Sequence, residues 1–256
     1  MTTNMLASNP SQQMPWRPTT TLSAVLLCFI AIALAGMLIP TATRLITWIV
    51  SLVLLASIVL IVGRGVTGRW FGFLIDERNK MSLSRFQAVL WSLLILSAFL
   101  AAALINLHLK LLSSPTDALA ITIPAELLAL LGISGTSLVG AQLILHAKSQ
   151  KLEQIATHLA ANQADWYDMF KGDDAANAAY LDLSKLQMFY STIILVLVYG
   201  FALAGMFMGG DPKSLAITAF PSLSATMVTL LGISHAGYLL YKAVPRAQTT
   251  AQPGTS

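Results

Sequence analysis

The chain has 256 residues, of which 56% are hydrophobic and only 10% are charged, and its mean hydropathy is +0.72. An ordinary soluble domain carries about 25% charged residues, and a soluble core of this size cannot hide so much apolar surface. Ordinary cytosolic enzymes, disordered proteins and free nucleic-acid binders are therefore excluded. The single cysteine, Cys28, also excludes an intrachain disulfide framework and a cysteine-based zinc cluster.

Six apolar stretches follow in chain order, each close to the ~20 helical residues that cross a hydrocarbon core of ~30 Å. Strand-like alternation is absent, and a helix in lipid satisfies its own backbone groups, so all six are predicted to be transmembrane helices. Their approximate ranges are 22–39, 45–62, 86–107, 125–145, 188–208 and 222–241.

The first stretch allows a second interpretation. Arg17, an apolar run and Ala33-Leu34-Ala35 have the order of a cleavable signal peptide. The apolar run continues past Ala35 to Ile39, however, and only one charge precedes it. A true first span is therefore favoured over a cleaved leader.

The Lys and Arg residues indicate the orientation of the spans. Cytoplasmic loops carry the excess of these residues. Arg44, Lys110 and Lys213 fall on one side of the membrane, and the other twelve fall on the side of both chain ends. We therefore expect both termini in the cytoplasm. The net charge of +4 follows from this signal for membrane insertion and from attraction to anionic lipid headgroups, so it does not require a nucleic-acid partner. The twelve are Arg17, Arg64, Arg69, Arg78, Lys80, Arg85, Lys148, Lys151, Lys171, Lys185, Lys242 and Arg246.

Two pentamers recur at an offset of 100 residues. LSRFQ at 83–87 corresponds to LSKLQ at 183–187, and LLGIS at 130–134 is identical to the pentamer at 230–234. Trp70-Phe71 and Asp76-Glu77 precede the first copy as Trp166-Tyr167 and Asp173-Asp174 precede the second, which is longer by four residues. The pattern indicates an internal repeat of two-helix hairpins.

Both copies enter from the same side, so their pseudo-two-fold axis is expected along the membrane normal. The predicted fold class is an all-α membrane protein of six transmembrane helices with a parallel internal repeat of two-helix hairpins. The predicted organisation is a cytoplasmic tail (1–21), a first transmembrane hairpin (22–62), repeat A (64–148), repeat B (149–245) and a disordered C-terminal tail (246–256).

The openings Ser84–Gln87 and Ser184–Gln187, with GISHAGY at 232–238, carry a family likeness. Over about residues 64–245 the chain resembles an uncharacterised group of bacterial multi-pass inner-membrane proteins. The resemblance implies the bacterial inner membrane as the location. It implies no catalytic or binding residue.

Each repeat opens with a serine followed three residues later by a glutamine. This spacing ahead of an apolar run is typical of a capping box, in which hydroxyl and amide satisfy the free N–H groups of the first turn. Ser84 with Gln87, and Ser184 with Gln187, are therefore predicted to cap the third and fifth spans. A polar ring that binds a ligand is the alternative interpretation.

Small residues in the fourth and sixth spans predict close helix packing. Gly132, Thr136 and Gly140 fall on one helix face, as do Gly232 and Ala236. Small residues four apart let membrane helices approach closely, so these two spans are expected to pack together. A pore lined by small hydroxyls is the alternative.

His235 is the only ionisable side chain well inside a predicted span, which makes it a candidate functional residue. With Ser234 and Ser134 it forms the candidate intramembrane polar site, and both serines are expected to hydrogen-bond across the helix contact. No second titratable group lies at a similar depth, so a structural role is favoured over a proton or ligand role.

The predicted loops carry most of the polar residues. Residues 70–75 are expected to form a short interfacial helix, and Leu152, Ile155 and Leu159 to extend the fourth span as a helical stripe. Asn106 and His108 are expected to reach interfacial water.

The acidic side chains of the longer loop are interpreted as solvated charges rather than a metal site; they are Asp165, Asp168, Asp173, Asp174 and Asp182.

No phosphate-binding loop, metalloprotease motif or nucleophile elbow is present in the sequence. The expectation is a non-enzymatic membrane component without cofactor or metal. It would present cytoplasmic segments 64–85 and 148–187 to a protein partner, and a homo-oligomer stays open. The alternative is a small channel or transporter, with its pathway between the fourth and sixth spans or at an oligomer axis.

Overall fold

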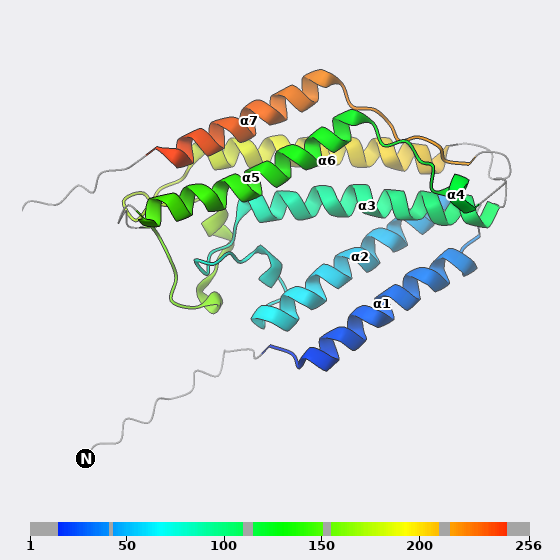
Figure 1. Ribbon diagram of the computed structural model, residues 1–256, viewed down its shortest axis with the longest axis horizontal. Helices are drawn as coiled ribbons and strands as arrows, with labels where there is room; N and C mark the ends of the chain where they lie inside the picture. Colours follow the sequence, from blue (N-terminus) through cyan, green and yellow to red (C-terminus); the bar gives the residue numbers. More distant parts are fainter. Residues whose placement is uncertain (1–14, 41–42, 110–114, 151–154, 210–215, 245–256) are drawn as a thin grey trace, which may run out of the picture.

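The computed structural model describes residues 15–40, 43–109, 115–150, 155–209 and 216–244. Within these residues six long helices run back and forth between the two ends of an elongated bundle (Figure 1). They are α1 (Pro18–Leu38), α2 (Arg44–Thr67), α3 (Leu83–Leu109), α5 (Ala125–Gln150), α6 (Leu183–Met208) and α7 (Ala225–Ala243). The short helices are η2 (Gly72–Leu74), α4 (Pro115–Ala118), η3 (Ala161–Gln163) and η4 (Trp166–Met169). The same residues contain isolated β-bridges but no strand.

Five helices of the described chain, α1, α2, α3, α5 and α6, are long and apolar enough to cross a membrane. By length and composition they indicate a multi-pass membrane protein. The sixth predicted span corresponds to α7, which has 19 residues but includes the polar His235 and Lys242 and is not among the five. The number of six spans therefore stays a prediction.

Most of the long helices begin before the apolar stretches that predicted them, whereas α7 begins at Ala225, inside its predicted stretch. α1 begins at Pro18, inside the predicted tail, and α3 and α6 begin several residues before their apolar runs. The stripe predicted to extend the fourth span is wrong, because α5 ends at Gln150 and neither Ile155 nor Leu159 is helical. Leu152 and the C-terminal tail 246–256 lie outside the described residues, as do residues 1–14.

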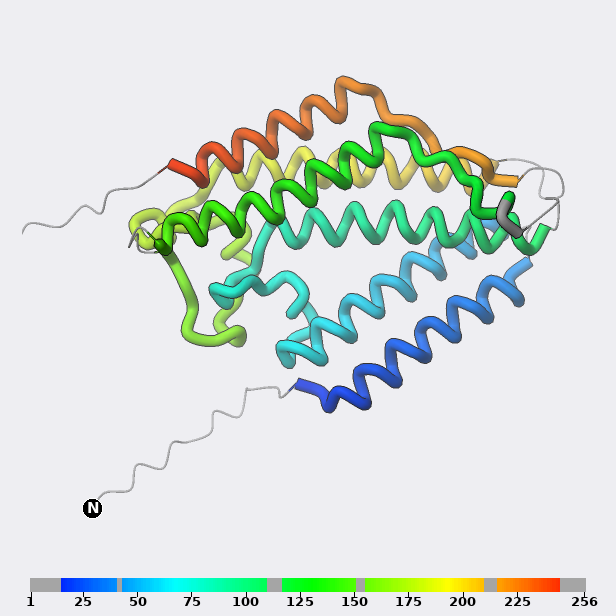
Figure 2. Tube along the Cα trace, in the orientation of Figure 1, coloured from blue at the N-terminus to red at the C-terminus, as the bar shows by residue number. Residues whose placement is uncertain are grey.

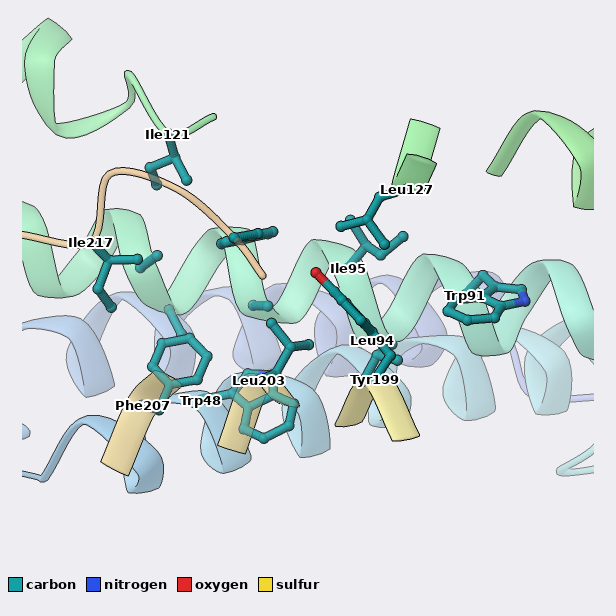
Figure 3. Close-up of a cluster of buried hydrophobic side chains, with 14 of the residues drawn as sticks. Trp48, Trp91, Leu94, Ile95, Ile121, Leu127, Tyr199, Leu203, Phe207 and Ile217 are labelled. Carbon is teal, nitrogen blue, oxygen red and sulfur yellow. The ribbon is translucent and has the colours of Figure 1, made fainter. Parts of the chain in front are cut away.

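α3 forms the centre of the bundle and contacts α1, α2, α5 and α6. Its buried face carries mainly large side chains up to Ile95 and then a series of small ones, which allow neighbouring helices to approach closely. The small ones are Ser97, Ala98, Ala101, Ala102 and Ala103. Trp48 of α2 is fixed against this face by a hydrogen bond from its Nε1 to Ser97 Oγ (3.1 Å) and by stacking on Phe207 at 5.3 Å. Figure 3 shows side chains from α2, α3, α5 and α6 gathered along this helix.

The outward faces of the long helices are apolar. Leu22 and Leu26 of α1 are 69% and 61% exposed, and Phe201 of α6 is 76% exposed. Many further Leu, Ile, Val and Phe side chains of the long helices are exposed in the same way. Water would oppose so large an apolar surface, whereas lipid tails would not.

Two loop segments, 68–82 and 155–182, fold together at one end of the bundle, where α1 begins and α7 ends (Figure 2). We call them the cap. In the first segment the Ser82 amide donates to the Leu74 carbonyl (2.8 Å), closing a hairpin just before α3. In the second, the Asp182 amide donates to the Phe170 carbonyl (2.8 Å) just before α6. Each cap segment therefore ends in a hairpin that is closed by a backbone hydrogen bond, one directly before α3 and the other directly before α6.

The short interfacial helix predicted over residues 70–75 is not formed. Only Gly72–Leu74 is helical, as the 3-10 turn η2, and the side chains of Leu74 and Ile75 are buried. These side chains pack with Met81 and Leu83 in a second apolar core under the cap. The segment folds into the cap because its apolar residues find protein partners there.

Asn106 does not reach water, contrary to the prediction. It is buried at the far end of the bundle, where its amide donates to the carbonyls of Ala118 (3.2 Å) and Ile217 (2.9 Å). Its carbonyl accepts from the Ile217 amide (2.7 Å). One side chain thus joins the two connections at this end, replacing the water that their backbone groups would otherwise bind. His108 is exposed, as expected.

Candidate functional site

A buried ionic network joins the cap to α6 and α7. At its centre the Asp173 carboxylate accepts hydrogen bonds from Arg78 Nη1 (2.8 Å), Lys185 Nζ (3.1 Å) and Lys242 Nζ (2.7 Å). The three cations come from the first cap segment, the start of α6 and the end of α7. We call these four residues the Asp173 network. It links three separate parts of the chain through one carboxylate.

The network determines the charge of its central carboxylate. Burial by itself raises the pKa of Asp173, but Lys185, Lys242 and Arg78 outweigh burial and hold that pKa well below its usual range. Burial likewise opposes the charge of Arg78, but the carboxylates of Asp173 and Asp76 prevail and raise its pKa. The Asp173 carboxylate and the Arg78 guanidinium are therefore both ionised near neutral pH.

Further ion pairs surround the network. Lys148 Nζ donates to both carboxylate oxygens of Asp174 (3.0 and 2.9 Å), and His158 Nε2 lies 3.1 Å from Asp168 Oδ1. Lys80 is buried but lies 4.0 Å from Asp168, and burial together with Arg78 lowers its pKa. The interpretation of this loop as solvated charge is thus wrong for four of its five carboxylates, since Asp165 alone is exposed. Two of the cations that make the burial of Asp173 tolerable lie far away in the sequence, because Arg78 is 95 residues and Lys242 is 69 residues from it.

The predicted capping box at Ser184 and Gln187 is wrong. Asp182 is the N-cap of α6, and its Oδ1 accepts from the amides of Ser184 (3.0 Å) and Lys185 (3.3 Å). Ser184 lies inside the helix and donates its hydroxyl to the same carboxylate (2.6 Å), while Gln187 is exposed. A carboxylate binds the positive end of a helix more strongly than a hydroxyl does, which explains the shift.

The box predicted at Ser84 and Gln87 is also wrong. Ser84 Oγ lies 3.5 Å from the hydroxyl of Tyr238 on α7, and Gln87 Nε2 donates to the Met188 carbonyl (3.2 Å) and to Thr192 Oγ1 (2.5 Å) on α6. Both side chains are buried. They point to neighbouring helices because Tyr238, Met188 and Thr192 offer hydrogen-bond partners inside the bundle.

α5 and α7 lie side by side, as predicted for the fourth and sixth spans (Figure 1). The predicted contact residues are largely wrong. Gly132, Thr136 and Ala236 are exposed, and only Gly140 and Gly232 lie near the partner helix, facing Leu239 and Ile133. α5 instead buries a neighbouring face, which consists of Leu127, Leu130, Ser134, Ser137, Ala141, Leu145 and Lys148.

His235 is buried and has a partner that the sequence analysis missed. Its Nδ1 lies 2.5 Å from the hydroxyl oxygen of Ser137 on α5. Ser134 and Ser234 are buried as well, but neither makes the expected hydrogen bond across the contact. Ser137 lies one helical turn after Ser134, so the shared face of α5 was the signal that could have identified it.

Several buried polar atoms of α3, α5 and α7 have no hydrogen-bond partner among the described residues. They are Gln87 Oε1, Trp91 Nε1, Ser134 Oγ, Ser234 Oγ and His235 Nε2. With Ser137 we call these residues the polar core. A buried polar atom without a partner costs about 1–3 kcal/mol, so ordered water or a small polar ligand is the natural complement to these atoms.

The polar core connects to the cap along the buried face of α7. Lys242 Nζ donates to the Tyr238 hydroxyl (3.0 Å), and His235 lies about one turn further along the helix. Within the described chain no group of three or more His, Cys, Asp or Glu side chains is placed to hold a metal ion. What this arrangement offers chemically is hydrogen bonding and fixed positive charge.

Comparison with known proteins adds no homologue: no protein-family model, curated protein or solved structure matches the chain. The resemblance to bacterial inner-membrane proteins stays an expectation from the sequence.

Proposed function

We propose that this chain is a non-enzymatic polytopic membrane protein that anchors a protein partner through the outer surface of its cap. In this proposal all six long helices cross the bacterial inner membrane, with the cap and both termini in the cytoplasm. The described start of α1 and end of α7 lie at the cap end of the bundle, which supports an even number of crossings (Figure 2).

The distribution of basic residues supports this orientation. Arg78, Lys148, Lys185 and Lys242 all take part in ion pairs of the cap, whereas Arg44 begins α2 at the opposite end. Positive charge accumulates on the cytoplasmic side of membrane proteins. The charge asymmetry of the sequence therefore coincides with one end of the fold.

We also infer that α3 with α5, and α6 with α7, descend from one duplicated hairpin. The β-bridge Ile75–Met81 precedes α3, and the bridge Lys171–Leu181 precedes α6. The second turn is longer, in line with the four extra residues in the sequence. Matching entry hairpins support a parallel repeat better than the pentamers do alone, because they extend the correspondence into the loops.

The observation that carries the anchor proposal is the contrast between the inside and the outside of the cap. Inside, the Asp173 network fixes the loops by buried ion pairs. Outside, the cap leaves large side chains uncovered: Leu159 is 95% exposed, Tyr167 68% and Tyr180 70%. Exposed apolar and aromatic side chains are typical of interaction surfaces, and a preformed surface loses less entropy on binding.

Site-specific photo-crosslinking in intact cells tests this proposal. A photoreactive side chain at Leu159 or Tyr167 is expected to give protein adducts of discrete mass, because both positions face the partner. The matched control is Leu197 of α6, which is 55% exposed within a span and should give lipid adducts only. An adduct of twice the chain mass would identify a second copy as the partner. Absence of protein adducts at both cap positions would contradict the proposal.

A channel or transporter is the second candidate, favoured by the unpartnered atoms of the polar core. Ion flux in liposomes separates the two candidates. The anchor proposal predicts no flux above that of empty liposomes. A robust flux that His235→Ala abolishes, and that the control His108→Ala leaves intact, would replace the anchor by a transport function.

A further inference from the structure

A groove opens between α3 and α5 just below the cap. It has a volume of about 550 Å³, and its walls include Ala88 and Val89 of α3 and Leu138 and Leu143 of α5. Leu143 is 63% exposed, so the groove faces the outside of the bundle, where lipid would lie. The walls are apolar over most of their surface.

A second hollow, of about 300 Å³, adjoins the first. It lies between α1, α2 and α3, and it shares Ala88 and Val89 with the groove. Phe29 and Ile58 line its other sides, and Ser92 is the one polar residue among the described residues that line it. The two hollows together form an apolar path along α3 that begins at the cap and runs toward the middle of the bundle.

The cap end of this path is polar and carries both signs of charge. Arg85 and Glu77 line the groove there, together with Gln142 and His146. Arg85 Nε is buried without a hydrogen-bond partner, and neither Arg85 nor Glu77 forms an ion pair with any described residue. This differs from the Asp173 network next to it, in which every cation has a carboxylate.

We propose that the path binds one phospholipid with a zwitterionic headgroup. The phosphate accepts hydrogen bonds from the guanidinium of Arg85, whose planar N–H groups match two phosphate oxygens. The ammonium of the headgroup lies against the carboxylate of Glu77. One acyl chain follows α3 over Ala88 and Val89 into the second hollow, where apolar walls exclude water.

The position of the charged end agrees with this occupant. Arg85 lies in the first turn of α3, where a helix that crosses a membrane passes through the headgroup layer. A headgroup with a phosphate alone would leave Glu77 facing like charge, whereas a phosphate with an ammonium satisfies both side chains. The proposal requires that α3 and α5 cross a membrane and is independent of any protein partner.

Native mass spectrometry of the delipidated full chain tests the proposal, with phosphatidylethanolamine and phosphatidylglycerol of the same acyl chains as probes. We expect one phosphatidylethanolamine per chain, bound about tenfold more tightly than phosphatidylglycerol. Arg85→Gln should weaken its binding about tenfold, and Glu77→Gln should remove the preference between the two lipids. Val89→Trp, which fills the path, should abolish the tight site. The control Leu197→Trp, on the outer face of α6, should leave it unchanged.

Equal binding of both lipids by the unaltered chain, or full binding by Arg85→Gln, would overturn the proposal and indicate ordinary lipid contact. Tighter binding of phosphatidylglycerol would overturn the zwitterionic assignment. Arg85→Gln and Val89→Trp act at opposite ends of the path, so misfolding of one variant leaves the other as a test. A melting temperature measured without added lipid shows whether each variant is folded.

Discussion

Asp173 shows how much a single side chain contributes to this molecule. Its carboxylate is the common partner of Arg78, Lys185 and Lys242, which belong to three different segments. Removing a buried carboxylate from such a set leaves buried cations without compensation. The folded cap, and the attachment of α7 to it, therefore depend strongly on one residue of an acidic loop.

We predict that Asp173→Asn lowers the free energy of unfolding by about 3–5 kcal/mol, the usual effect of removing one partner from a buried ion pair. Reversible denaturation in detergent measures this loss. The control is Glu126→Gln, which removes a carboxylate from the first turn of α5 and should cost no more than about 1 kcal/mol. Equal losses in the two variants would show that the network adds nothing to stability.

The same carboxylate predicts how stability depends on pH. The folded-state pKa of Asp173 lies below that of the unfolded chain, so its contribution is complete above the ordinary aspartate pKa of about 4 and is lost as the pH falls further. The difference in melting temperature between the wild type and Asp173→Asn should be constant from neutral pH to about pH 5 and should shrink below about pH 4. A difference that shrinks already near neutral pH would contradict the assigned ionisation.

Helices were easier to predict than their contacts. Hydropathy identified the apolar stretches without any knowledge of neighbours, because crossing a hydrocarbon layer requires length and apolar composition alone. Which face of α5 is buried depends on its neighbours, and an almost uniformly apolar helix has no periodicity that marks a face. The face with Gly132 and Thr136 was therefore predicted to be buried although the face with Ser134 and Ser137 is the buried one.

The candidate site was only partly accessible to sequence analysis for a similar reason. His235 was identified because an ionisable residue inside an apolar stretch is conspicuous. Its partner Ser137 is 98 residues away, and Arg78 is 95 residues from Asp173. Such pairings follow from how the helices assemble, and an acidic loop whose partners are unknown resembles a solvated one.

Gly63 of α2 provides a test of the close contact between this helix and the first segment of the cap. A Cβ atom at this position would lie 2.9 Å from the backbone nitrogen of Phe73. We predict that Gly63→Ala lowers the free energy of unfolding by about 1–3 kcal/mol through overpacking. Gly200→Ala on α6 is the matched control, since no atom other than those of its chain neighbours and its own helix backbone lies within 4 Å of its Cβ position, and it should be neutral or stabilising by up to about 1 kcal/mol. Thermal unfolding in detergent measures both, and a shift of the same sign and size would exclude a close contact at Gly63.

The arrangement of the entire bundle depends on whether α7 crosses the membrane. Its hydropathy does not decide the matter, because α7 contains His235, Tyr238 and Lys242 and is not among the five helices that are long and apolar enough to cross a membrane. All three are buried against protein, however, so the side chains that reduce its hydropathy are not those that would meet lipid. The exposed side of α7 carries Leu230, Ile233 and Leu240. An apolar outer face and a polar inner face are what a span within a bundle requires.

Cysteine mapping in intact cells tests this topology. In a Cys28→Ser background, single cysteines replace Ala175 in the cap, Thr122 at the far end and Val244 after α7, all of which are exposed. A maleimide that cannot cross membranes should label Thr122→Cys directly, and Ala175→Cys and Val244→Cys only after permeabilisation, because six crossings place the cap and the end of α7 together in the cytoplasm. Direct labelling of Ala175→Cys would reverse the orientation. Direct labelling of Val244→Cys with Ala175→Cys still protected would mean that α7 ends on the other side, which the ion pair between Lys242 and Asp173 does not allow in this fold.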